Sequence, residues 1–222
     1  FVPPIPGLKD IDYLTADNLW DLTEQPKRLV VLGGGPIGSE LSQAFGRLGT
    51  QVTQVEMLPQ LLAKEDPDAA QYLYDQLIKD GVDVRLNTTA TAIEKTAEGK
   101  FIVLEKDGKQ EKLPFDEILI AVGRIANLKG FGLEKLDIET NRVVVTNEML
   151  QTKYPNILAA GDVAGPYQFT HTAAHQAWYA AVNALFRPFK TFKVDYRVIP
   201  WATFTDPEIA TVGLNEQAAK EQ

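Results

Sequence analysis

Apolar and polar positions in the first part of the chain follow two periods, one typical of buried strands and one typical of helices. Three short runs predict strands of a buried parallel sheet, namely Arg28–Leu32, Gln51–Glu56 and Val82–Leu86. Two longer segments between them repeat apolar residues at helical spacing, namely Ile37–Leu48 and Pro67–Lys79. This strand-helix-strand-helix-strand order predicts an α/β fold with a parallel, doubly wound sheet.

The pattern changes after the third strand. Three shorter strands are predicted at Thr91–Lys95, Phe101–Glu105 and Glu111–Leu113. Asp107-Gly108 between the last two is a hairpin signal, so we expect an antiparallel meander laid on the parallel sheet. The apolar run Glu117–Val122 then predicts a return to the buried sheet.

A different unit is expected to begin at Gly123. Its predicted elements are a short strand at Asn156–Ala160, an alanine-rich helix at Thr172–Leu185, and strands at Val198–Thr205 and Pro207–Gly213.

The turn between the first strand and the first helix carries the main chemical signal. Its residues match the pattern G-x-G-x-x-G, and they are Gly33, Gly34, Gly35, Pro36, Ile37 and Gly38. The pattern is informative here because a predicted strand precedes it and a predicted helix follows it. In such a turn the first glycine permits the bend, the second lets the backbone approach a pyrophosphate, and the third lets helix and strand pack closely. The helix N-terminus then offers unpaired N–H groups to the phosphates.

An acidic residue completes this nucleotide pattern. Glu56 ends the second predicted strand, 21 residues after Gly35. A carboxylate there accepts hydrogen bonds from ribose hydroxyls and repels a 2′-phosphate, and no arginine follows among Met57–Gln60. The pattern therefore favours NAD over NADP. Two plainer interpretations stay open, a strand end that merely turns at the glycines and a solvated Glu56.

Composition excludes several functions. The formal net charge of −8 lacks the basic surface that nucleic acid binding needs, so no nucleic acid partner is expected. Without cysteine the chain has no disulfide or thiolate chemistry of its own, and His171 and His175 lack the pattern of a metal site. No apolar run approaches the roughly 20 residues of a membrane span, and we expect a cytoplasmic protein.

Five ordered motifs now support a family assignment. They are the segment Val2–Leu8, the glycine turn through Glu40, Ala121–Arg124, Pro155–Asp162 and Thr203–Gly213. In these the chain resembles the FAD-dependent pyridine nucleotide-disulfide oxidoreductases, the group of dihydrolipoamide dehydrogenase, glutathione reductase and mercuric reductase. The resemblance implies a Rossmann-like three-layer FAD/NAD(P)-binding fold. One departure is Ile125-Ala126-Asn127, which lacks a proline common in the family.

The resemblance implies roles for further residues on the NAD side. The family carboxylate matching Glu40 pairs with a lysine near the flavin. Without the resemblance, Glu40 is equally well interpreted as an acid in the first turn of a helix. Ala90 matches a backbone contact near the adenine, and Gly123 matches a position near the nicotinamide.

On the flavin side, Asp162 matches the acid that binds a ribityl hydroxyl of FAD. Phe169, Thr170 and His171 lead into a helix whose N-terminus faces the flavin in the family. Taken alone, Gly161-Asp162 is also compatible with an ordinary loop that caps a helix.

Motif order divides the chain into an NAD(H)-binding domain at 24–122, a partial FAD-binding domain at 1–23 and 123–190, and the start of a dimerisation domain at 191–222. The resemblance implies hydride transfer from NADH to FAD and on to a disulfide or another acceptor, in a homodimer. The first flavin fingerprint, the cysteine pair and a histidine-glutamate pair of the family have no counterpart in these residues, so we expect a piece of a longer protein. It should bind nucleotide without turnover, and no catalytic residue is assigned.

Three alternatives remain at this point. The first is an active reductase that holds its own flavin. The second is an interaction module without a redox role, and the third is part of a flavin reductase of the ferredoxin-reductase type. Incomplete strand faces in the second half also predict lower order or self-association there.

Overall fold

A computed structural model describes residues 1–221 of the chain. It has two compact units. The first contains residues 1–123 and the chain from Ala202 onward, and the second contains Arg124–Trp201.

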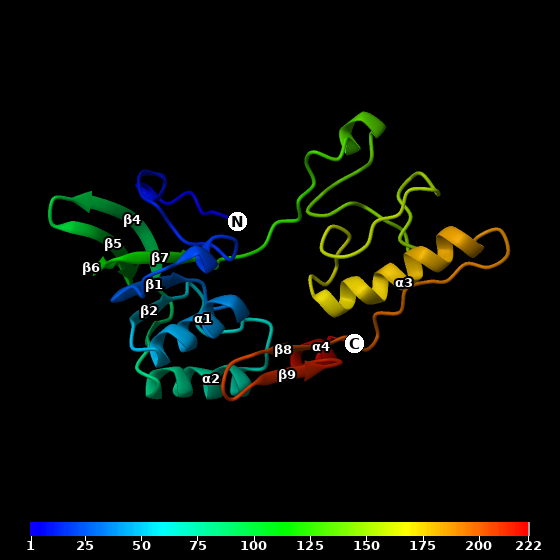
Figure 1. Ribbon diagram of the computed structural model, residues 1–222. Helices are drawn as coiled ribbons and strands as arrows, with labels where there is room; N and C mark the ends of the chain where they lie inside the picture. The colour runs from blue at the N-terminus through cyan, green and yellow to red at the C-terminus, as the bar shows by residue number, and fades with distance from the viewer. Residues whose placement is uncertain (222) are drawn as a thin grey trace. The chain divides into compact units, whose positions relative to one another are not determined.

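A four-stranded parallel sheet forms the centre of the first unit (Figure 1). Its strands lie in the order β3-β2-β1-β7, and their bounds are Arg28–Leu32 (β1), Gln51–Val55 (β2), Asp83–Arg85 (β3) and Glu117–Ile120 (β7). All three neighbouring pairs are parallel. The predicted strands are confirmed, β1 with the predicted bounds and the other three with ends one or two residues shorter.

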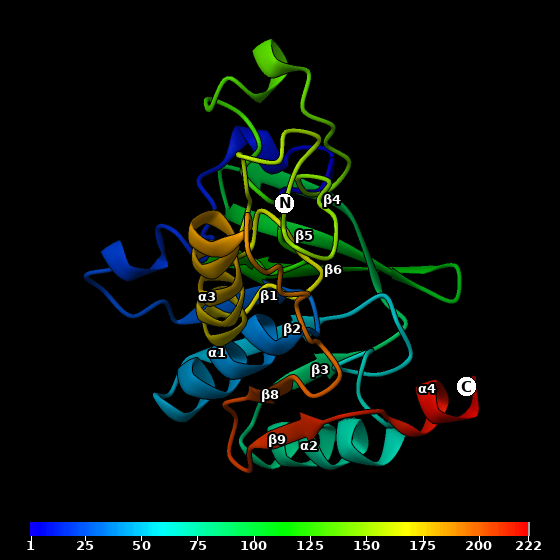
Figure 2. The same cartoon turned by 90° about the vertical axis from the view of Figure 1, so that its right-hand side faces the viewer.

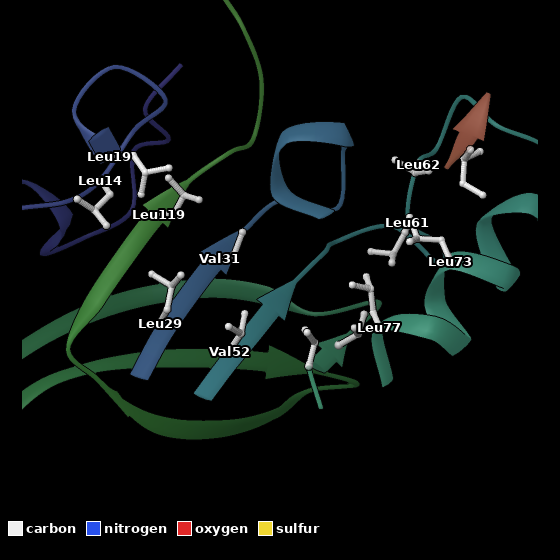
Figure 3. Packing of buried hydrophobic residues seen from close by; sticks show 13 residues of the cluster. Leu14, Leu19, Leu29, Val31, Val52, Leu61, Leu62, Leu73, Leu77 and Leu119 are labelled. Carbon is white, nitrogen blue, oxygen red and sulfur yellow. The ribbon is translucent and has the colours of Figure 1, made fainter. Parts of the chain in front are cut away.

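Two helices cover one face of this sheet. They are α1 (Pro36–Arg47) and α2 (Pro67–Lys79), and both begin with a proline, whose missing N–H is not needed in a first turn. Figure 3 shows the packed side chains between sheet and helices, which include Leu29, Val31, Val52, Leu73, Leu77 and Leu119. Alternate residues of each strand point to this face, which explains the spacing of two along β1.

The opposite face packs against an antiparallel sheet. Its strands are β4 (Thr89–Thr96), β5 (Gly99–Lys106) and β6 (Lys109–Phe115), and the predicted hairpin turn at Asp107-Gly108 joins β5 to β6. The apolar residues between the two sheets include Val30, Leu32, Val55, Ile102, Phe115, Ile118 and Ile120. Helices, parallel sheet and meander form three layers, as Figure 2 shows from the side. The predicted three-layer α/β fold is confirmed.

Short elements flank these layers. Two single-turn 3-10 helices, η1 (Leu8–Asp10) and η2 (Leu19–Asp21), precede the sheet. Strands β8 (Pro200–Thr203) and β9 (Ile209–Val212) pair with each other, and helix α4 (Glu216–Lys220) follows. The start of α4 lies beside the start of α2, since the Glu216 N–H donates to Asp66 Oδ1 over 3.0 Å.

The second unit has little regular structure. Its elements are the short helix η3 (Leu133–Leu136) and the long helix α3 (Thr170–Phe186), which confirms the predicted helix with two and one more residues at its ends. The strand predicted at Asn156–Ala160 is wrong, because only an isolated bridge between Gln151 and Leu158 forms there. A strand needs a continuous partner, and this apolar run has none in the described residues.

The compact units divide the chain differently from the motif-based domains, both in residues 1–23 and after residue 190. Residues 1–23 belong to the first unit, where Leu8 and Leu14 are buried and Leu14 forms a bridge to Leu119 of β7. The assignment of residues 1–23 to a flavin domain stays a prediction about function.

Candidate functional site

The glycine turn lies at the carboxyl ends of the central strands of the first unit. The Gly33 N–H donates to Val55 O of β2 over 2.8 Å, and the Ala121 N–H donates to Leu32 O of β1 over 2.8 Å. In the sheet, β2 and then β3 lie on one side of β1, and β7 lies on the other side. In open α/β sheets, ligands bind at this edge where the strand order reverses.

Each glycine of the pattern is required for a different reason. Gly33 has φ +116°, and a Cβ there would lie 2.5 Å from Ala121 O. A Cβ on Gly38 would lie 2.1 Å from Gly33 O, so this glycine lets α1 approach the end of β1. A Cβ on Gly35 would have no protein atom within 4 Å. The space beside Gly35 is therefore open, as close approach of a pyrophosphate requires.

Helix α1 begins at this open space. Gly35 is its N-cap and provides no side-chain cap, and Pro36 is its first residue. The first helical bond runs from the Ser39 N–H to Gly35 O over 2.9 Å, so the N–H groups of Ile37 and Gly38 precede it. A diphosphate suits these donors and the positive end of the helix dipole, so the residues present fit the nucleotide predicted from the sequence.

Glu56 is fixed beneath the turn. Its Oε2 accepts a hydrogen bond from the Gly34 N–H over 2.6 Å, and its Oε1 accepts one from the Leu58 N–H over 2.8 Å. A Cβ on Gly34 would lie 2.9 Å from the Glu56 carboxylate, so the space beside Gly34 is also filled by protein atoms. Each carboxylate oxygen has two lone pairs, which leaves acceptor capacity for ribose hydroxyls.

Gln54 and Ser39 contact the turn, and the sequence patterns did not predict these contacts. Gln54 is fully buried in β2, and its Nε2 donates to Gly33 O over 3.1 Å and to Ser39 Oγ over 3.2 Å. A glutamine within a short strand reads as a solvent-facing residue, so its pattern carried no signal for this contact.

Glu40 has a partner that the sequence did not predict. Its Oε1 accepts a hydrogen bond from the Phe204 N–H over 2.8 Å. The interpretation as a first-turn acid is wrong, because the helix begins at Pro36 and Glu40 lies beyond its first turn. One turn further, Gln43 exchanges two hydrogen bonds with the backbone of Asp206, at 2.7 and 2.8 Å. Helix α1 therefore holds the segment before β9.

Two other predicted residues lie in the first unit. Ala90 is in β4, beside the irregularity between Ala90 and Ala92 in its pairing with β5. Gly123 has φ +146° and is the last residue of the unit before Arg124.

The residues expected on the flavin side are all in the second unit. Asp162 Oδ2 accepts a hydrogen bond from Arg124 Nη1 over 3.2 Å, and the Asp162 side chain stays 46% exposed. Phe169 is the N-cap of α3 and Thr170 its first residue. The Phe169 ring stacks on His171 at 5.4 Å between centroids and on Trp201 at 6.3 Å.

A buried glutamine joins α3 to the turn before Asp162. Gln176 Oε1 accepts from the Gly161 N–H over 2.6 Å, and its Nε2 donates to Gly165 O over 2.5 Å and to the Tyr196 hydroxyl over 2.7 Å. Burial raises the pKa of that tyrosine, although the hydrogen bond from Gln176 opposes the shift. Gln176 could not be predicted from the sequence either, because periodicity shows only that this helical residue is polar and not what it binds.

Residues 1–221 contain neither a cluster of metal ligands nor a membrane-spanning helix. No group of three or more His, Asp or Glu side chains is placed to hold a metal ion. No helix in this range is long and apolar enough to cross a membrane.

The comparisons with known proteins agree with this fold. The chain belongs to the pyridine nucleotide-disulphide oxidoreductase family, whose sequence profile matches residues 1–177. It is 39% identical over 223 aligned positions to a mercuric reductase of Staphylococcus aureus, covering 100% of this chain and 40% of that protein. It is 38% identical to a dihydrolipoyl dehydrogenase of Thermus scotoductus, covering 92% of this chain and 46% of that protein.

Solved structures show the same architecture. The HOCl-induced flavoprotein disulfide reductase RclA from Escherichia coli superposes with a TM-score of 0.87 at 30% identity, covering 100% of this chain and 51% of that one. LpdA from Mycobacterium tuberculosis gives a TM-score of 0.81 at 30% identity, covering 94% and 45%. The chain thus spans about half the length of its relatives or less.

Proposed function

We propose that this chain is the NAD(H)-binding portion of a flavin-dependent oxidoreductase that passes hydride from NADH to FAD and on to a disulfide or another acceptor. The observation that carries the proposal is the open space beside Gly35 at the start of α1, next to the fixed carboxylate of Glu56. Family membership supports the redox role. The chain alone binds the nucleotide without turnover.

The residues of the turn have distinct tasks in this proposal. The N–H groups at the start of α1 bind and orient the pyrophosphate, and the helix dipole favours its charge. Glu56 accepts hydrogen bonds from the adenosine ribose and repels a 2′-phosphate, which makes NAD the preferred nucleotide. Ala90 contacts the adenine side, Gly123 lies near the nicotinamide, and Glu40 belongs to the flavin side of the site.

In the complete protein, Asp162 would bind a ribityl hydroxyl of FAD. The exposed half of its side chain fits this role, since a single ion pair leaves lone pairs free. The N-terminus of α3, with Phe169, Thr170 and His171, would favour negative charge on the flavin. FAD held by these residues would supply the redox chemistry, that is, acceptance of hydride from NADH and transfer of electrons to the acceptor. A homodimer formed through the residues from 191 onward, working in the cytoplasm where NADH is supplied, is part of the same proposal.

Calorimetric titration with NADH and NADPH tests the nucleotide role. Glu56→Gln removes the charge while keeping an acceptor for the ribose and for the Gly34 N–H, so NADPH affinity should rise toward that of NADH. Glu56→Ala also removes the acceptor, so NADH affinity should fall about tenfold. Binding of neither nucleotide at millimolar concentration to the wild-type chain would overturn the proposal. An unchanged preference in Glu56→Gln would remove Glu56 from the account.

The absence of turnover has its own test. The purified chain should show no flavin absorbance, and added FAD should not be bleached by NADH. A yellow sample that NADH bleaches would instead favour a chain that holds its own flavin.

A further inference from the structure

Gln54 is a fully buried amide in a strand whose other core positions are apolar. Val52 and Val55 on either side are 2% and 4% exposed, and Gln54 is 0% exposed. Burying an amide is unfavourable unless its hydrogen bonds are made inside the protein. The Oε1 atom of Gln54 has no partner within residues 1–221, so the amide is turned to serve its donors alone. The groups that bind the Gln54 donors therefore indicate what this buried side chain is for.

Both donor contacts of Gln54 end on the glycine turn. Its Nε2 donates to Gly33 O over 3.1 Å and to Ser39 Oγ over 3.2 Å, and Ser39 Oγ in turn donates to Gly34 O over 3.5 Å. The side chain therefore reaches two successive carbonyl groups, one directly and one through Ser39.

Gln54 and Glu56 hold opposite sides of one peptide group. Side chains two residues apart on a strand point to the same face, so both lie beneath the turn. Gln54 binds the carbonyl of Gly33, and Glu56 Oε2 accepts from the N–H of Gly34, 2.6 Å away. This carbonyl and this N–H belong to the same planar unit, so the two contacts fix its rotation.

The orientation of that peptide sets the geometry of the nucleotide site. Gly33 O is the atom that a Cβ on Gly38 would meet at 2.1 Å, so the position of the carbonyl decides how closely α1 approaches. Gly35 and the free N–H groups of the first helical turn follow directly after it. We propose that Gln54 is a positioning residue that, with Glu56, locks the Gly33-Gly34 peptide and so preorganises the pyrophosphate-binding N–H groups of α1. This inference rests on the proposed nucleotide function and names the ligand group it serves, the diphosphate.

The test uses the whole chain and two ligands that share the adenosine, ADP-ribose and adenosine itself. Gln54→Met keeps the length of the side chain and removes both donors. We expect the Kd of ADP-ribose to rise about tenfold, since two hydrogen bonds to the turn are lost. The Kd of adenosine should change less than about twofold, because Glu56 and the ribose contact remain. Thr53→Val, on the other face of β2, is the matched control and should change neither.

Amide hydrogen exchange at Gly34 and Ser39 without ligand gives a second readout. It should accelerate in Gln54→Met. A smaller acceleration is expected in Ser39→Ala, which removes one acceptor of Gln54 and the relay to Gly34 O but keeps the bond from Gln54 to Gly33 O. An unchanged Kd of ADP-ribose, or an equal loss for both ligands, would overturn the role of Gln54 while leaving the nucleotide function intact. A wild-type chain that binds neither ligand would instead refute the nucleotide function. If Gln54→Met does not fold, Gln54→Asn takes its place, since the shorter amide stays polar but withdraws its donor from Gly33 O. Unchanged exchange at Gly34 in that variant would refute the locked peptide.

Discussion

Gly35 and Gly38 belong to the same turn, yet an added methyl group would meet different surroundings at each. At Gly38 it would lie 2.1 Å from the carbonyl oxygen of Gly33, a main-chain atom that cannot move without shifting β1 or α1. At Gly35 it would have no protein atom within 4 Å, and φ is −76°, a value that alanine adopts easily. One position is restricted by the fold, and the other is open toward solvent.

Two alanine substitutions separate these roles. Gly38→Ala should lower the free energy of unfolding by about 2 kcal/mol or more, because the core must shift to relieve the contact. Gly35→Ala should lower it by less than about 1 kcal/mol, since alanine is only a poorer N-cap than glycine. NADH affinity should nevertheless fall at least about tenfold in Gly35→Ala, because the methyl group occupies the space of the pyrophosphate.

Denaturant unfolding and calorimetric titration on the same samples measure both effects. Gly81→Ala, at a helix C-terminus with φ +85°, provides a control in which stability falls and NADH affinity does not. Full NADH affinity in a folded Gly35→Ala variant would place the pyrophosphate elsewhere.

The glycines and Glu56 could be identified from the sequence, because their spacing follows from the geometry of a strand-turn-helix unit. Gln54 and Gln176 could not. A buried glutamine is identified by the particular groups it faces, and these come from residues 11 or more positions away in the chain, as with Gln54 and Ser39 or Gln176 and Gly165. Periodicity reports only that the side chain is polar.

At the scale of elements, the first unit follows its local patterns closely. The helices α1 and α2 and the meander are specified by apolar periodicity and by the Asp107-Gly108 turn, which need no distant partner. Asn156–Ala160 has the composition of a buried strand but no neighbouring strand to pair with. Composition can predict that a run is extended, whereas the ladder depends on the rest of the fold.

One ion pair at a strand junction gives the first unit a predicted pH dependence. Asp116, between β6 and β7, accepts from the Arg28 N–H over 2.8 Å and from Arg28 Nη2 over 2.6 Å. Hydrogen bonds from Arg28 lower the pKa of Asp116 below its ordinary value of 3.8, against the opposing effect of burial. The carboxylate therefore stabilises the fold fully above pH 4 or so, and this contribution is lost as the pH falls through the lowered folded-state pKa.

Asp116→Asn should accordingly lower the melting temperature by a few degrees at pH 7 and leave it nearly unchanged at about pH 2. Thermal melts of variant and wild type across this range measure the difference. Asp107→Asn, at the exposed tip of the β5–β6 hairpin, makes the same charge change as a control and should leave the profile unaltered. A constant difference at every pH would mean that Asp116 acts through packing or neutral hydrogen bonds and not through its charge.

At the scale of the molecule, helix α3 of the second unit has an unusual polarity. The residues it buries are polar, namely Thr172, Gln176 and Asn183. Gln176 and Asn183 hold nearby loops by hydrogen bonds such as Asn183 Nδ2 to Phe192 O at 2.8 Å. Three of its large apolar residues are exposed, with Trp178 at 55%, Leu185 at 71% and Phe186 at 50%. An exposed apolar helix face of this kind favours association.

We therefore expect the isolated chain to self-associate through this face at micromolar concentration. Leu185→Lys should raise the dissociation constant at least about tenfold, because burial of one leucine is worth roughly 1.5–3 kcal/mol and a charge opposes it. Its unfolding free energy should stay within about 0.5 kcal/mol, since the residue is exposed in the monomer. Sedimentation velocity at several concentrations measures the association. Ile78→Lys, at a residue of α2 that is 45% exposed, is the matched control and should leave it unchanged. If the wild-type chain sediments as a monomer at every concentration, or if both variants weaken association equally, the apolar face of α3 does not drive contact between copies.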